Sequence, residues 1–134
     1  MGKKVIAAGH ICLDITPAFP EKKEMKIGDV LQPGKLLEVG NATVSTGGSV
    51  ANTGLGMKIL GADVTLMGKI GTDAFGDMVC SLLEKYEVSD AMIRSQNEAT
   101  SYSIVLAVPG NDRSFCIILE QIILFAWQML MRRF

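Results

Sequence analysis

A pair of adjacent glycines at the expected start of a helix is the feature that most constrains the fold of this chain. Gly47 and Gly48 precede small residues and then a run rich in Leu, Met and Ile, which is typical of a tight turn that opens into a helix. Gly61 stands where such a helix usually stops. The apolar run at residues 64–68 then predicts a buried strand. A helix that leads directly into a buried strand favours an α/β fold.

The segments on either side continue this alternation. Residues 5–8 form a short apolar run before Gly9, which predicts a buried strand of a parallel sheet. Either Thr72 or Asp73 can cap a second helix. The apolar positions of that helix are spaced as on one helix face: Phe75, Met78, Val79, Leu82, Leu83 and Tyr86. We therefore expect a parallel sheet with helices packed against it.

Two further segments predict strands outside this alternation. Residues 16–40 hold three of the four prolines amid charged residues, and they favour a loop with short edge strands, of which 35–39 is the strongest. Residues 102–108 alternate larger and smaller side chains, as a strand does. Pro109 and Gly110 suit the centre of a type II turn, so a hairpin is expected here.

The composition fits one globular domain and excludes several classes of function. A length of 134 residues is that of one domain, and an apolar fraction of 49% is enough for a core. Thirteen basic and fourteen acidic residues give a net charge of −1, so there is no electrostatic case for binding nucleic acid or an anionic membrane. The apolar run after Lys4 is too short for a signal peptide, and we expect a cytoplasmic protein.

Metal-binding and nucleotide-binding motifs are missing. Cys12, Cys80 and Cys116 are widely spaced without a C-x-x-C pair, and His10 is the single histidine, so neither a disulfide framework nor a zinc site is expected. A Walker A loop is absent because Asp77 stands where that motif requires lysine. A dinucleotide fingerprint also fails, because the glycine pair is expected to follow an irregular segment and not a strand.

Three polar features could bind a hydroxyl-rich ligand, although local structure explains each of them when taken alone. Backbone N–H groups of Gly47 and Gly48 favour anionic or hydroxyl-rich groups at a helix start, but a tight turn also requires glycine. Asp14 lies just beyond the carboxyl end of the first strand, and its carboxylate can accept two sugar hydroxyls, or it is a cap or surface charge. Asn52 can donate to and accept from a hydroxyl, or cap the helix.

Taken together, these features resemble the PfkB, or ribokinase-like, family of carbohydrate kinases. The resemblance lies in residues 9–14 (Gly-His-Ile-Cys-Leu-Asp), 47–52 (Gly-Gly-Ser-Val-Ala-Asn) and 68–76, with Gly61 at the family's spacing. Residues 99–115 also resemble the lid hairpin of the family.

Three departures from the ribokinases leave ribose in doubt as the substrate. Ser49-Val50 replaces Lys-Gly, Gly54 replaces a Ser, Thr or Ala, and Cys12 replaces an Asn. The sequence does not identify the sugar, and nucleosides stay open as substrates.

The resemblance implies the N-terminal part of a three-layer α/β/α fold with a small β lid, truncated in this chain. Residues 1–115 would form its sugar-binding part, with lid strands within 16–45 and 94–115. In the family such a lid closes over the sugar and excludes water, and in several members it forms a homodimer. The positions that contact sugar hydroxyls in the family are Asp14, Gly47, Gly48 and Asn52.

The resemblance also implies what this chain lacks. The full-length family uses ATP and Mg²⁺, with a catalytic Asp in a D-T-x-G-A-G-D motif near the C-terminus. That motif does not occur here, so we expect no catalytic residue and no effective binding of ATP or Mg²⁺. The implied activity is ATP-dependent phosphorylation of a sugar or nucleoside hydroxyl, in a chain that lacks the catalytic and ATP-binding half.

The last nineteen residues, 116–134, differ sharply in composition from the rest and are far more apolar. With Glu120, Gln121 and Gln128 inside, they fall short of the ~20 apolar residues of a membrane span. In a shifted reading frame, permitted codons for residues 116–121 can encode His-His-Pro-Gly-Ala-Asn, and Pro-Gly-Ala-Asn fits the family after its lid hairpin. We therefore expect a foreign tail produced by a frameshift near Phe115.

Two other hypotheses stay open on the sequence. The chain could be a non-catalytic sugar-binding or dimerisation module derived from the kinase lid, because it keeps Asp14 and Asn52 without a general base. A small protein attached to a membrane through residues 116–131 is less consistent with the sequence, because the flanks of a lipid anchor are missing.

Overall fold

The computed structural model describes residues 4–20, 26–88 and 91–118, which form two small sheets and three helices. The first sheet has the order β1-β4-β5 and contains β1 (Val5–Gly9), β4 (Val64–Gly71) and β5 (Ile93–Ser95). The second has the order β3-β2-β6-β7 and contains β2 (Cys12–Pro17), β3 (Ala42–Gly47), β6 (Tyr102–Leu106) and β7 (Ser114–Ile117). The helices are α1 (Ile27–Val30), α2 (Gly48–Ile59) and α3 (Ala74–Glu84).

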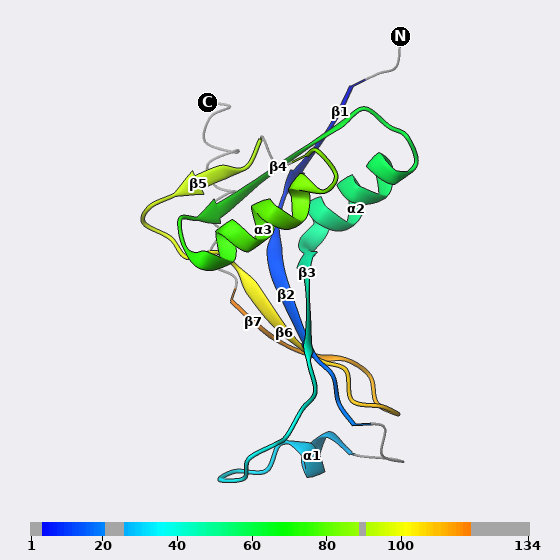
Figure 1. Ribbon diagram of the computed structural model, residues 1–134, viewed down its shortest axis with the longest axis vertical. Helices are drawn as coiled ribbons and strands as arrows, with labels where there is room; N and C mark the ends of the chain where they lie inside the picture. Colours follow the sequence, from blue (N-terminus) through cyan, green and yellow to red (C-terminus); the bar gives the residue numbers. More distant parts are fainter. Residues whose placement is uncertain (1–3, 21–25, 89–90, 119–134) are drawn as a thin grey trace, which may run out of the picture.

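The first sheet is parallel and carries the two longer helices. β1 pairs with β4 from Val5 opposite Val64 to Gly9 opposite Gly68, and β5 extends the sheet beyond β4. Because parallel neighbours cannot be joined by a tight turn, helices lie in the connections around β4. Both α2 and α3 contact β4 (Figure 1). The predicted α/β class, a parallel sheet with packed helices, is confirmed.

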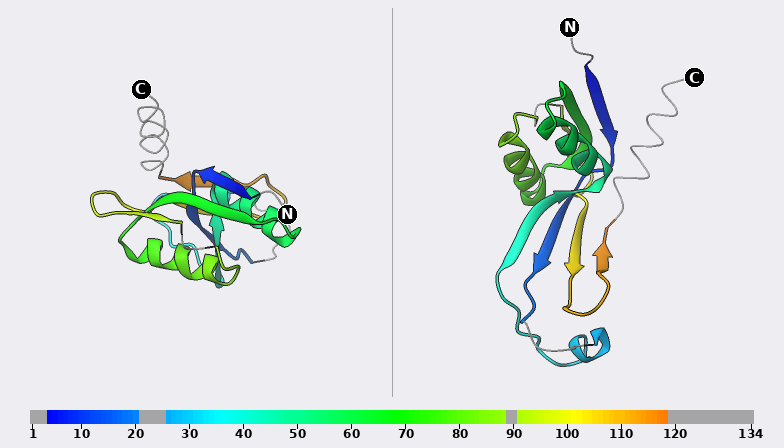
Figure 2. Two further views of the ribbon diagram at one scale, coloured as in Figure 1. Left: turned by 90° about the horizontal axis from the view of Figure 1, so that it is seen from above. Right: turned by 90° about the vertical axis from the view of Figure 1, so that its right-hand side faces the viewer.

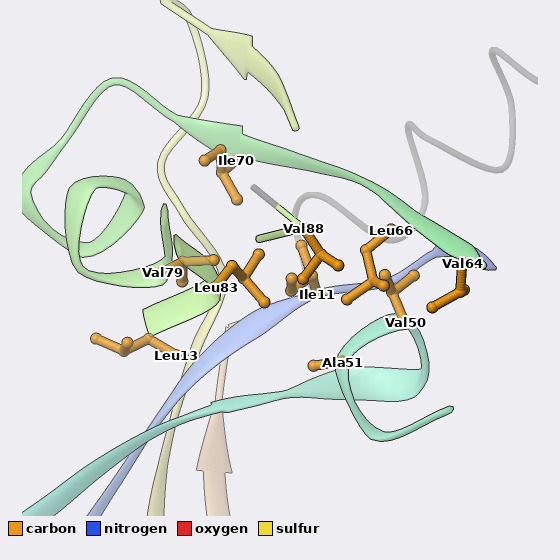
Figure 3. Close-up of a cluster of buried hydrophobic side chains, with 10 residues drawn as sticks. All are labelled: Ile11, Leu13, Val50, Ala51, Val64, Leu66, Ile70, Val79, Leu83 and Val88. Carbon is orange, nitrogen blue, oxygen red and sulfur yellow. The ribbon is translucent and has the colours of Figure 1, made fainter. Parts of the chain in front are cut away.

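One apolar core joins this sheet to both helices and to the start of the second sheet (Figure 3). Its most buried members, each at most 2% exposed, are Ile11, Leu13, Val50, Ala51, Leu66, Ile70, Val79 and Leu83. Full burial of such a Leu or Ile side chain contributes roughly 1.5–3 kcal/mol. Ile11 and Leu13 belong to the same short stretch as Asp14, so the core fixes Asp14 relative to the first turn of α2.

The second sheet extends away from α2 and α3 (Figure 2, right). β2 pairs with β3 in antiparallel fashion, from Cys12 opposite Gly47 to Pro17 opposite Ala42. β2 also pairs with β6 in parallel, which sets Asp14 opposite Ser103. β6 and β7 form the predicted hairpin. In its turn the backbone N–H of Asn111 donates a hydrogen bond to the carbonyl of Val108.

The local helix signals of the sequence are confirmed. α2 begins at Gly48, and Gly61 lies just beyond its end with φ of +86°. Asp73 caps α3, because its side chain accepts a hydrogen bond from the Gly76 amide. The predicted apolar face of α3 is only partly buried: Val79 and Leu83 are buried, whereas Met78 is 47% exposed. Tyr86, expected on the same face, lies beyond the end of α3 and is 39% exposed.

Two expectations about the proline-punctuated segment are wrong. Residues 35–39 form no strand, and the strand lies instead at β3. Leu36 is fully exposed, because the chain comes alongside its pairing partner β2 only from Ala42 onward. The glycine pair therefore does follow a strand, although an antiparallel one of the second sheet and not the parallel strand of a dinucleotide fold.

A hydrogen-bonded cluster ties the end of β4 to the start of α3 and to the segment before β6. Asp73 Oδ1 accepts from Thr100 Oγ1 at 2.6 Å and Asp73 Oδ2 accepts from the Thr100 amide at 2.7 Å. Thr100 Oγ1 in turn accepts from the Gly71 amide at 2.8 Å. Burial raises the pKa of Asp73, but the hydrogen bonds from Thr100 and from the Gly76 and Phe75 amides outweigh it and hold this pKa below its usual value.

The first residues of the expected foreign tail belong to β7. Cys116 lies opposite Ile104 and Ile117 opposite Ser103, and the Ile118 amide donates to the Tyr102 carbonyl. The rest of the tail, from residue 119 on, lies outside the described residues. The frameshift near Phe115 therefore stays a prediction, which resequencing of the gene tests.

Candidate functional site

A cavity of about 370 Å³ lies where the second sheet meets the first turn of α2. It is lined by His10, Cys12, Asp14, Gly48, Asn52, Tyr102, Ser103, Phe115, Ile117 and Ile118. The lining contains one carboxylate and no Lys or Arg side chain. A volume of this order fits a small ligand such as a monosaccharide or nucleoside.

Asp14 is held in this cavity by its neighbours on the second sheet. Ser103 Oγ donates a hydrogen bond to Asp14 Oδ1 at 2.5 Å, and the Cys12 thiol donates to the same oxygen at 3.4 Å. Both donors act on Oδ1, and among the described residues none donates a hydrogen bond to Oδ2. The carboxylate is therefore oriented by protein groups and keeps acceptor capacity for a hydroxyl group of a ligand.

Gly47 is required by the position of Asp14. A Cβ atom at residue 47 would lie 2.5 Å from Asp14 Cγ, closer than nonbonded carbon atoms come. The backbone of Gly47 has φ of −124°, so the requirement comes from the carboxylate and not from the backbone conformation.

Gly48 is required twice over. Its φ of +86° suits glycine, and a Cβ there would lie 2.6 Å from the carbonyl oxygen of His10. The same carbonyl accepts a hydrogen bond from the Val50 amide at 3.0 Å, which attaches the residues before β2 to the start of α2. The glycine pair thus allows the first turn of α2 to lie close to β2, the strand that carries Asp14.

Burial changes the ionisation of two residues beside Asp14. Desolvation, together with the negative charge of Asp14, raises the pKa of the Cys12 thiol to about 12. The thiol is therefore protonated at neutral pH, and it lines the cavity as a weakly polar group and not as a nucleophile. Burial lowers the pKa of His10, and the charge of Asp14 opposes this only in part. The imidazole is therefore neutral at pH 7.

The structure brings most of the predicted residues together. Asp14, Gly48 and Asn52 line one cavity, and Gly47 packs against the Asp14 carboxylate just behind it. Residues that the sequence interpretation missed are His10, Ser103 and the apolar wall of Tyr102, Phe115, Ile117 and Ile118. Alternation in β6 separates Ser103 from Tyr102 on opposite strand faces, but only the pairing with β2 reveals that Ser103 meets Asp14.

The lining of this cavity does not suit a triphosphate such as ATP. A cavity with a carboxylate and no Lys or Arg would repel a triphosphate. Groups of three or more His, Cys, Asp or Glu side chains that could hold a metal are absent from residues 4–20, 26–88 and 91–118. Asp77, at the position where a Walker motif has lysine, is exposed and pairs with Arg94 at 2.7 Å.

A second hollow of about 600 Å³ lies at the far end of the second sheet, between residues 18–20 and 37–40. Its lining is mostly apolar and carries Glu38 as its one ionisable residue. Within the part of the chain that the structure describes, none of the helices is long and apolar enough to cross a membrane.

The fold and the cavity together define an α/β domain with a small-molecule site between its helix-bearing sheet and a second, four-stranded sheet. The model of the pfkB family of carbohydrate kinases matches residues 3–131. The chain therefore belongs to the pfkB carbohydrate kinase family. The match continues through most of residues 116–134, beyond the expected frameshift position.

Several known proteins are similar to this chain, and each match covers a different fraction of it. The bifunctional protein HldE of Hydrogenovibrio crunogenus is 32% identical over 94 residues, which are 59% of this chain and 19% of HldE. A fructokinase from Xylella fastidiosa, solved with bound ATP, has a TM-score of 0.65 at 23% identity over 89% of this chain and 34% of its own. A ribokinase from Cryptococcus neoformans, solved with ADP, has a TM-score of 0.64 at 22% identity, covering 88% and 35%.

A ribokinase from Giardia lamblia has a TM-score of 0.69 at 16% identity, over 88% of this chain and 36% of its own. These similarities confirm the ribokinase-like fold. The chain spans about a third of the length of these solved kinases and about a fifth of HldE.

Proposed function

We propose that this chain is the sugar-binding part of an ATP-dependent carbohydrate kinase. In this proposal the cavity at the start of α2 binds a sugar or nucleoside, with Asp14 accepting one or two hydroxyl hydrogens. Asn52 and the backbone amides at Gly47 and Gly48 provide the other polar contacts. The observation that carries the proposal is the convergence of Asp14, Gly48 and Asn52 on one cavity, with Gly47 fixed against the same carboxylate.

The chemistry of the cavity supports a neutral, hydroxyl-rich ligand. Asp14 has a free acceptor oxygen, and a carboxylate-to-hydroxyl hydrogen bond is short and strong. Phe115 and Ile117 of β7 share the strand face of Ser103 and offer apolar surface to the carbon face of a sugar or to a nucleobase. A few polar groups among apolar lining residues are typical of small-molecule sites.

Phosphoryl transfer would require more than this cavity. The acceptor hydroxyl must lose a proton to a base within hydrogen-bond reach, and the transferred phosphoryl group needs positively charged or amide donors. Asp14 is the one carboxylate among the cavity residues, and it is engaged by Ser103 and Cys12. We therefore expect this chain alone to bind the acceptor and not to phosphorylate it.

Calorimetric titration of the chain tests this proposal. D-ribose, D-fructose, adenosine and uridine are the probes, and Asp14→Ala is the site variant. Asp77→Asn, an exposed position away from the cavity, is the matched control for loss of one carboxylate. The proposal expects at least one probe to bind, Asp14→Ala to abolish that binding, and Asp77→Asn to keep it. Binding that survives in Asp14→Ala, or ATP-dependent turnover by the chain alone, would contradict it.

A non-catalytic binding or dimerisation module is the second candidate. It is favoured by the exposed apolar side chains of the second sheet, with Val44 39% and Phe115 57% exposed, since such surface suits a lid-mediated homodimer. Sedimentation of the chain with and without a bound sugar separates the two candidates. Neither candidate involves nucleic acid or a membrane, and both fit a cytoplasmic location.

A further inference from the structure

His10 combines two properties that the proposed sugar ligands do not explain. Its side chain lines the cavity with Asp14 and Asn52, and its Nδ1 atom is buried without a hydrogen-bond partner. The other ring nitrogen, Nε2, is not among the buried unpartnered atoms of the described residues. The ring therefore turns Nδ1 towards the protein interior, and it turns the edge that carries Nε2 towards the cavity.

The burial of Nδ1 decides which nitrogen carries the proton. A neutral imidazole has one N–H donor and one lone-pair acceptor. A buried N–H without an acceptor is rarer, and more costly, than a buried acceptor without a donor. The neutral ring therefore holds its hydrogen on Nε2, on the cavity side.

The backbone of His10 is tied to the start of α2, and its ring lies beside Gly48. The backbone carbonyl of His10 is bonded to the Val50 amide at 3.0 Å, and the ring Cδ2 atom lies 3.0 Å from the position of a Cβ on Gly48. Burial keeps the imidazole uncharged although Asp14 lies nearby. A fixed, neutral donor costs little reorganisation when a ligand binds.

We propose that His10 is a specificity-determining residue, whose Nε2–H donates a hydrogen bond to a substrate oxygen next to the hydroxyl that Asp14 accepts. This inference rests on the proposed sugar-binding function. Asp14 requires a hydroxyl hydrogen and His10 requires an oxygen lone pair, so the pair matches two neighbouring oxygens. The ligand class is therefore a compound with a vicinal diol, such as the diol of a furanose ring.

Amide side chains distinguish the two ring nitrogens in a direct test. The amide nitrogen of Gln reaches the place of Nε2, whereas that of Asn reaches the place of Nδ1. We expect His10→Gln to bind the diol probes D-ribose and adenosine within about threefold of the wild type, and His10→Asn and His10→Phe to bind them about tenfold more weakly, the loss expected for one hydrogen bond. 2′-Deoxyadenosine lacks the diol and should bind weakly to the wild type, with little further loss in His10→Phe.

A second readout does not depend on ligand binding. Because His10 is the single histidine, long-range ¹H–¹⁵N correlation spectra of the full chain report its tautomer without assignment ambiguity. We expect the Nε2–H form at pH 7.5. The Nδ1–H form would overturn the inference, whatever the variants do. Equal binding by the wild type, His10→Asn and His10→Phe would overturn it and leave the proposed function intact. Absence of binding by the wild type would overturn both.

Discussion

Ser103 Oγ donates a 2.5 Å hydrogen bond to Asp14 Oδ1 across the parallel pair β2 and β6, between residues 89 positions apart in the sequence. This bond orients the one carboxylate of the cavity. It also joins the hairpin β6–β7 to β2, the strand that carries Asp14. A movement of the hairpin therefore changes the direction in which Asp14 presents its free oxygen.

Replacing this serine is expected to affect both binding and stability. Ser103→Ala removes a donor to a charged group, and a hydrogen bond of this kind contributes about 1.5–3 kcal/mol. We expect sugar affinity to fall about tenfold or more, and the free energy of unfolding in urea to fall by about 1.5–3 kcal/mol. Calorimetry and denaturant titration measure the two effects.

Ser101→Ala is the matched control for this variant. Ser101 is 1% exposed and its hydroxyl is buried without a partner, so its removal is expected to be neutral or to stabilise the chain by up to about 1 kcal/mol. Equal losses of stability in both serine variants would show that the Ser103–Asp14 bond has no special contribution.

Two glycines of α2 are expected to respond oppositely to alanine. A Cβ at Gly54 would lie 2.5 Å from Cγ of Leu66, a fully buried core residue, so Gly54→Ala should destabilise the chain by about 1–3 kcal/mol. At Gly56 the Cβ would meet nothing within 4 Å, so Gly56→Ala should stabilise it by about 0.5–1 kcal/mol. Thermal unfolding of the two variants measures the difference, and a stabilised Gly54→Ala would contradict the close packing of α2 on β4.

The Thr100–Asp73 cluster predicts a stability that depends on pH. Because the folded-state pKa of Asp73 lies below its usual 3.8, its contribution is complete above pH 3.8 and is lost as pH falls through that value towards the folded-state pKa. Thr100→Val removes the hydroxyl that bonds Asp73 and leaves the Gly71 amide without its acceptor.

We expect Thr100→Val to lower the free energy of unfolding by about 2–3 kcal/mol at pH 7. This difference in unfolding free energy from the wild type should become smaller below pH 3.8. Thr100→Ser keeps the hydroxyl and should retain most of the stability. Denaturant titrations between pH 3 and 7 test this, and a gap that widens in acid would exclude the carboxylate as its cause.

The pKa of His10 should reveal the charge of Asp14 directly. Burial lowers this pKa below 6.5, and the carboxylate raises it in part. Asp14→Asn removes the opposing charge, so the pKa should fall further. Titration of the ring C–H signals by NMR measures it in the single histidine. Because the unfolded chain binds the proton more readily, stability should fall as pH drops below 6.5 towards the folded-state pKa. A rise of the pKa in Asp14→Asn would contradict the placement of the two side chains.

The sequence predicted those elements whose signals are local. The glycine pair, the Asp73 cap and the stop at Gly61 belong to the helices that they begin or end, so α2 and α3 were predictable. The hairpin was predictable for the same reason, because Pro109 and Gly110 specify its turn.

The long-range strand pairs were not predictable in the same way. β3 was misplaced by several residues, because its bounds depend on where the chain meets β2 and not on its own composition. Asp14 and Asn52 were recognised from the family pattern, whereas the roles of His10 and Ser103 depend on contacts that only the folded chain creates.

Amide ¹H–¹⁵N spectra of the chain, recorded during titration with D-ribose, D-fructose and adenosine, are the decisive test of a sugar site at Asp14. They report the position of a ligand as well as its binding, and the hollow at the far end of the second sheet serves as a comparison for the cavity at Asp14. We expect the amide signals of Gly48 and Asn52 to shift with ligand concentration, and Asp14→Ala to remove these shifts. The signals of Phe19 and Val39, which line the hollow at the far end of the second sheet, should not shift. Shifts confined to the distal hollow, or shifts at Gly48 that persist in Asp14→Ala, would contradict a sugar site built on Asp14.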